Sequence, residues 1–161
     1  MVGIYPTVGC LVFLDKNSLD EAKRQVLISL QDLIPQNSWQ QTSVVTLVAL
    51  ALIGGSRLQA LVHFIIPQTG VFAFIGFDED QIVHLARYTG LTITELLSPY
   101  VAAFETVPGS EAVGMGFELS PLTGMEDSDL KEAGISLLFV RNRDTSRWER
   151  REVLPMVGHY L

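Results

Sequence analysis

Two long stretches without a charged side chain, residues 33–56 and 58–77, dominate the first half of the 161-residue chain. A helix that spans a membrane needs about 20 consecutive apolar residues. The first stretch does not meet this need because residues 35–43 are mostly polar, and the second is interrupted by Pro67 and Gly70. We therefore expect both stretches to be buried inside a folded domain, with no membrane insertion.

The composition is typical of a folded chain with little charge. Hydrophobic residues make up 48% of the chain and charged residues only 18%, and the mean hydropathy is +0.30. The length fits one domain over residues 1–161. The lone cysteine, Cys10, lies in an apolar run and has no internal disulfide partner, which suits the reducing cytoplasm. We expect a soluble, cytoplasmic domain that buries apolar surface in a homo-oligomer or against a protein partner.

Apolar periodicity and turn residues predict an α+β fold, in which a small sheet is packed by about five helices. The sheet gathers an N-terminal strand at residues 8–14, a strand near 70–76 and a C-terminal hairpin over 135–154. Capping boxes at Ser18, Ser38 and Ser56 predict the starts of three helices. Further helices are expected at residues 79–89 and after Thr92, where Pro99 should kink or split the last one. Residues 107–124 are expected as a loop with a strand at 115–119, followed by a short helix at 128–133.

The second expected helix contains residues 44–53, VVTLVALALI, which would be apolar on every side. Such a helix is buried all round or lies at an interface. On this interpretation Leu50 is a core residue. Leu50→Asp should then be strongly destabilising, because it places an unpaired charge in the core.

Charge is distributed unevenly along this acidic chain. The net charge is −7, and residues 78–132 carry a net −9 whereas residues 133–161 carry a net +2. Nucleic-acid affinity depends on Lys and Arg side chains that neutralise phosphates, so a nucleic-acid partner is disfavoured. The asymmetry fits head-to-tail self-association or docking on a basic partner, but charge runs usually form a solvated face, which is the interpretation we favour.

Residues 81–101, QIVHLARYTGLTITELLSPYV, resemble a helix-turn-helix segment. Gly90 and Leu91 would form the turn, Thr92 would cap the second helix, and Leu96 would pack inward. That helix has no Arg, Lys, Asn or Gln, which are the side chains that read bases and hold phosphates. The segment therefore predicts a packed helical corner, with DNA recognition as the alternative.

The C-terminal hairpin supplies the candidate partner-binding residues: Arg141, Arg143, Arg147, Trp148, Arg150 and Arg151. These side chains can hold a phosphate backbone or an acidic protein. On strand alternation, Arg147, Glu149 and Arg151 share one face while Trp148, Arg150 and Glu152 share the other. Because both faces carry mixed charges, we expect cross-strand ion pairs on a solvated sheet, with partner binding as the alternative.

No motif for catalysis, phosphate binding or metal binding is present. The histidines, His63, His84 and His159, have no G-x-S-x-G companion, and there is no P-loop. The carboxylate clusters at 78–80 and 126–129 lack EF-hand spacing and lie where helices should begin. We expect no cofactor. The sequence favours a non-enzymatic protein-interaction, scaffold or regulatory domain that self-associates. The alternative is a nucleic-acid-associated regulator using residues 81–101 or the arginine hairpin, and an enzyme with a cryptic carboxylate or histidine site comes third.

Overall fold

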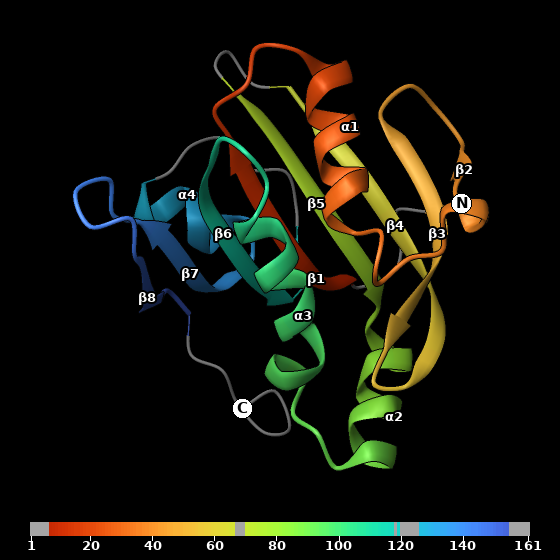
Figure 1. Ribbon diagram of the computed structural model, residues 1–161. Helices are drawn as coiled ribbons and strands as arrows, with labels where there is room; N and C mark the ends of the chain where they lie inside the picture. Colours follow the sequence, from red (N-terminus) through yellow and green to blue (C-terminus); the bar gives the residue numbers. More distant parts are fainter. Residues whose placement is uncertain (1–6, 67–69, 118, 120–125, 155–161) are drawn as a thin grey trace.

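The computed structural model describes residues 7–66, 70–117, 119 and 126–154, and these contain eight strands in one antiparallel sheet (Figure 1). The strand order is β2-β3-β4-β5-β1-β6-β7-β8. The strands are β1 (Thr7–Leu14), β2 (Gln40–Gln41), β3 (Thr46–Ile53), β4 (Ser56–Ile65), β5 (Val71–Asp78), β6 (Ser110–Phe117), β7 (Ile135–Arg141) and β8 (Trp148–Glu152). The helices are α1 (Leu19–Ser29), α2 (Glu79–Thr89), α3 (Ile93–Glu105) and α4 (Asp127–Glu132), with a short 3-10 helix η1 (Gln36–Ser38).

The predicted small sheet with about five helices is wrong. The second and third expected helices are instead the long strands β3 and β4, and all of β3 pairs with residues 56–63 of β4. Gly54 and Gly55 both have positive φ, 55° and 78°, and they turn a hairpin where we expected them to end a helix. Ser38 does not cap an α-helix either: its hydroxyl accepts a hydrogen bond from the Leu50 N–H at 3.4 Å.

The other expected elements are present with modest shifts. The strands at 8–14 and 70–76 and the C-terminal hairpin correspond to β1, β5 and β7–β8. Ser18, Asp78 and Thr92 cap α1, α2 and α3 through their side-chain oxygens. Pro99 lies inside a single helix and does not split α3. The strand expected at 115–119 is the longer β6.

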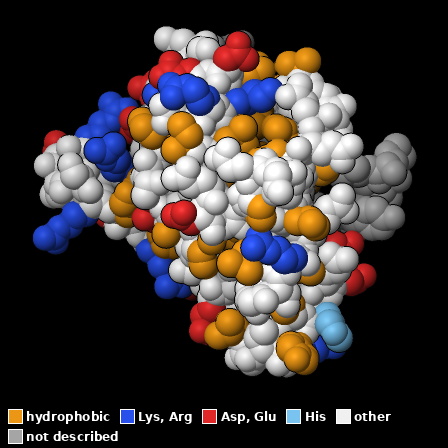
Figure 2. Space-filling view, turned by 45° about the vertical axis from the view of Figure 1, so that its right-hand side comes forward, with side chains coloured by type: hydrophobic (Ala, Val, Ile, Leu, Met, Phe, Trp, Pro, Cys, Tyr) orange, Lys and Arg blue, Asp and Glu red, His pale blue; other side chains and the backbone are white. Residues whose placement is uncertain are grey.

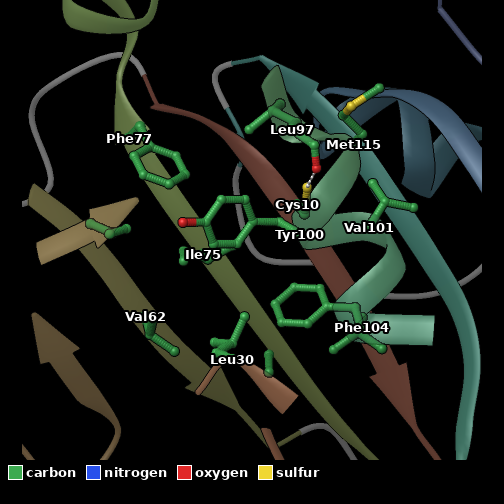
Figure 3. Packing of buried hydrophobic residues seen from close by; sticks show 14 of the residues in the cluster. Cys10, Leu30, Val62, Ile75, Phe77, Leu97, Tyr100, Val101, Phe104 and Met115 are labelled. Atoms are coloured by element: carbon green, nitrogen blue, oxygen red, sulfur yellow. Dashed lines mark hydrogen bonds between the residues drawn. The ribbon is translucent and has the colours of Figure 1, made fainter. Parts of the chain in front are cut away.

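Helices α1, α2 and α3 pack on one face of the sheet, which we call the helical face (Figure 1). The centre of this core lies between α3 and the β1–β5 pair, where the ring of Tyr100 packs edge-on against Phe77 with centroids 5.5 Å apart (Figure 3). Cys10 points into the same cluster, and its thiol contacts the Leu97 carbonyl. None of the described helices is long and apolar enough to cross a membrane.

The opposite face of the sheet has a smaller apolar cluster on β1, β5, β6 and β7, against which Ile65 and Phe74 also pack. Leu130 of α4 is fully buried in it, together with Leu11 and Leu138. The only helix among the described residues that packs on this face is α4, and it contacts β7. The face is therefore covered at its β6–β7 end, and α4 does not extend over β3 and β4.

The outer edge of β3 is closed by side chains and by the segment that follows α1. β2 pairs only with Leu47 and Val48. Beyond it, the Ser38 hydroxyl accepts from the Leu50 N–H, and the Leu33 carbonyl accepts from the Leu52 N–H at 2.8 Å. The Tyr100 hydroxyl donates to the Leu52 carbonyl at 2.6 Å. This edge therefore has few backbone groups left for a further strand.

Candidate functional site

The six hairpin residues do not converge on one surface. Arg141 lies directly opposite Trp148, and Phe139 lies opposite Arg150. Since Phe139 and Trp148 pack against the core of the helical face, Arg141 and Arg150 lie on that face as well. Arg151 pairs in register with Leu138 on the opposite face. The predicted alternation of the hairpin side chains is thus confirmed for Trp148, Arg150 and Arg151.

The ion pairs of the hairpin arginines connect it to the rest of the fold. Arg143 contacts Glu111 at 3.3 Å, and Arg151 contacts Asp127 at the start of α4 at 2.7 Å. The hydrogen bond and charge of Arg151 hold the pKa of Asp127 below its usual value. Arg141, Arg147 and Arg150 form no ion pair with any other described residue. The expected cross-strand ion pairs inside the hairpin are therefore absent among the described residues.

A shallow groove of about 210 Å³ runs between α3 and the hairpin on the helical face. Its floor is formed by Val101, Met115 and Phe139, and its α3 wall includes Ser98 and Glu105. Partial burial raises the pKa of Glu105 above its usual value. Its one charged lining residue is Glu105, and the neighbouring β8 brings Arg150, opposite Phe139, and Glu152 to the same face of the sheet. The groove has no single-sign field that would select an anion.

The helix-turn-helix-like segment forms a packed corner. Gly90 ends α2 with φ of 76°, as its role in the turn requires. In α3, Ile93, Leu97 and Phe104 are fully buried, so the helix presents its apolar face to the sheet. The residues left on its outer side, Glu95 and Ser98 among them, include no base-reading or phosphate-binding cation.

The chemistry-bearing side chains do not form a reaction centre. Ser56, Asp80 and His84 line an open pocket of about 480 Å³ between α2 and β4, but no hydrogen bond joins these three described side chains. A triad needs its members within hydrogen-bond reach. Burial raises the pKa of the Cys10 thiol, which makes it a poor nucleophile. No group of three potential metal ligands occurs among the described residues.

No pattern in the sequence indicated the apolar area that β3, β4 and β5 carry on the face away from the helices. In β3, the buried residues Leu47, Ala49, Ala51 and Ile53 alternate with three residues that point away from the helices. Together with the neighbours that share their face, they form an area that we call the open face and define by seven residues: Val48, Leu50, Leu52, Leu61, His63, Ile65 and Phe74. The polar residues on the same face are Thr46, opposite His63, and the exposed Gln59 and Arg57, opposite Leu50 and Leu52.

The open face is apolar and only partly covered. Leu50 is 51% exposed, and the other members of the open face are half-buried. Figure 2 views the molecule from the side on which the helices lie. On the surface shown there, hydrophobic side chains lie in small groups separated by polar and charged ones. None of the seven residues is acidic or a Lys or Arg; the charged described residues nearest to them in register are Arg57, opposite Leu52, and Asp78 at the end of β5.

His63 lies on strand β4 within the open face, and not in the helix that was expected to begin at Ser56. Its Nδ1 atom is 2.8 Å from the Thr46 hydroxyl, and its ring centroid is 5.4 Å from that of Phe74. Partial burial lowers the pKa of His63 from its usual value. The ring is therefore mostly neutral at pH 7 and behaves there as part of the apolar surface.

Comparisons with protein-family models, curated proteins and solved structures gave no match for this chain. The two surfaces that can carry a function are therefore the open face and the C-terminal hairpin.

Proposed function

We propose that this chain is a non-enzymatic protein-interaction or scaffold domain that associates with copies of itself. The observation that carries the proposal is the open face, an apolar area on a sheet whose other face is covered by three helices. Exposed apolar area costs about 25 cal/mol for each Å² that stays in contact with water. Contiguous apolar patches on proteins commonly mark interaction sites.

The low charge content supports self-association rather than capture of a highly charged partner. Only 18% of residues are charged, and the open face has Arg57 at its margin as its one described cation. A strongly acidic or basic partner would find few opposite charges there. A second copy brings the same apolar surface, and twofold pairing is the commonest way in which such surfaces are buried.

Sedimentation velocity at micromolar concentrations tests this proposal. We expect a dimer or a larger assembly at low salt and again at about 1 M salt, where the screening length is about 3 Å. Apolar burial survives such screening, whereas an assembly held by the acidic segment and the hairpin would dissociate. A monomer of 17.8 kDa under both conditions would contradict the proposal.

A nucleic-acid-associated regulator is the second candidate, because Arg141, Arg147 and Arg150 have no described ionic partner near Trp148. We expect duplex binding no tighter than about 10⁻⁵ M at physiological salt, the range of non-specific contacts. A titration with mixed-sequence duplex measures this. Sub-micromolar affinity that is lost in Arg141→Ala/Arg150→Ala but kept in Arg151→Ala would favour the regulator instead.

A further inference from the structure

We propose that the open face is itself the self-association surface, that it pairs with the open face of a second copy, and that His63 makes this pairing sensitive to pH. The inference rests on the proposed function and specifies its partner, its surface and its regulation. The pairing is a stack of two sheet faces, rather than the addition of a strand to a sheet edge.

The two edges of the sheet favour face pairing over edge pairing. At the β3 edge, Ser38, Leu33 and Tyr100 already bind backbone groups of Leu50 and Leu52. At the other edge, β8 is short and reads Trp-Glu-Arg-Arg-Glu. Short, charged edge strands are the usual protection against strand addition. The apolar surface that remains for association is the face.

The size of the open face fits a weak dimer. Three strands about 4.8 Å apart and about 26 Å long give roughly 400 Å² in projection, and the rough side-chain surface adds to this. Stable interfaces bury about 600 Å² or more on each partner. The open face is therefore near the lower limit, and we expect a dissociation constant in the micromolar range.

His63 would be buried in such a stack, and nothing described beside it can neutralise a positive charge. The groups that face it are Thr46 from β3 and Phe74 from β5, with Leu61 and Ile65 along β4. None of these titrates. Two charged residues share the strand alternation of this face: Arg57 lies about 20 Å away along β4, and Asp78 lies about 13 Å along β5 from Phe74. Neither is beside the ring, and the Asp78 carboxylate accepts a hydrogen bond from the Gln81 N–H at the start of α2. The carboxylates of α4 lie over the β7 end of the sheet.

The pairing must therefore select the neutral form of His63 in both copies. Burial already lowers the pKa of His63 in the single copy, and pairing removes further water from the ring. Association is then strongest above the pKa of the free ring and is lost as the pH falls below it, in a window below about pH 6.5. Because up to two protons leave per dimer, the dissociation constant should rise by up to about 100-fold per pH unit there.

Sedimentation equilibrium of matched variants tests the surface. Leu50→Asp should weaken pairing by about 100-fold or more, because it buries a charge in the interface. Ile28→Asp is the control, since Ile28 is 45% exposed on α1, outside the open face. It should pair as the wild type does. Leu61→Glu on the neighbouring strand repeats the test and decides it if Leu50→Asp does not fold, as judged by circular dichroism.

The pH dependence is tested by measuring the dissociation constants of the wild type and of His63→Gln between about pH 7.5 and pH 5. The wild-type dimer should dissociate as the pH falls, whereas His63→Gln should stay paired. An equal loss of pairing in both would overturn the role of His63. An oligomer that persists in Leu50→Asp and Leu61→Glu would overturn the surface but leave self-association intact. A wild-type monomer at every pH would contradict the proposed function itself.

Discussion

Ala51→Asp is expected to unfold the protein, whereas Leu50→Asp should leave the fold intact. The two residues are neighbours on β3 but point to opposite faces: Ala51 is 0% exposed in the core and Leu50 is 51% exposed on the open face. A carboxylate at position 51 would be buried without a partner beneath the helices, a class of substitution that costs about 4 kcal/mol or more. At position 50 the carboxylate can remain in water in the single copy.

Urea denaturation of both variants, followed by circular dichroism at one low protein concentration, measures this difference. The low concentration removes any contribution from self-association to the apparent stability. Similar free energies of unfolding for the two variants would show that residues 46–53 are not a strand with one buried face. A helix over residues 44–53 would have made Leu50→Asp strongly destabilising. The exposed position of Leu50 on β3 reverses that expectation.

Tyr100→Ala is the second substitution with a large expected effect. Tyr100 is fully buried between α3 and the sheet, and it both packs on Phe77 and donates to the Leu52 carbonyl. Truncation of a buried aromatic side chain costs about 3–5 kcal/mol. Tyr100→Phe keeps the ring and removes only the donor, so its cost should be about 1–3 kcal/mol.

The comparison of the two Tyr100 variants separates packing from hydrogen bonding. Thermal and urea unfolding give the two free energies, and amide exchange reports the β3 edge. Tyr100→Phe should increase exchange selectively in residues of β3, because the loss of the donor loosens that edge. If Tyr100→Phe were as costly as Tyr100→Ala, the assignment of most of the energy to ring packing would be wrong.

Local sequence patterns predicted an element correctly where the residues that begin and end it lie within that element. Ser18, Asp78 and Thr92 mark helix starts by capping chemistry that acts within a few residues. The apolar runs of β1 and β5 are central strands with both faces covered or partly covered, and a continuous apolar run is typical of such strands.

The same signals failed for residues 38–65, because apolar side chains on both faces of a strand resemble apolar side chains all round a helix. Val48 and Leu50 face away from the helices while Leu47 and Ala49 face the core, yet the sequence gives all four the same character. The two faces differ only in what covers them, and this depends on where α1–α3 and α4 pack. The open face could not be predicted for that reason, although the expectation of hidden apolar surface was made from composition.

The contact between Tyr100 and Leu52 has a consequence for aggregation. Residues 44–53 form an uncharged, proline-free segment with high β propensity, the composition that favours cross-β assembly. Many proteins protect such a segment with charged gatekeeper residues. Here no charge is available within it, and part of the protection comes from a hydroxyl that is 48 residues away in the chain. The segment is synthesised before α3, so the hydrogen bond from Tyr100 to Leu52 can form only after α3 has packed on the sheet.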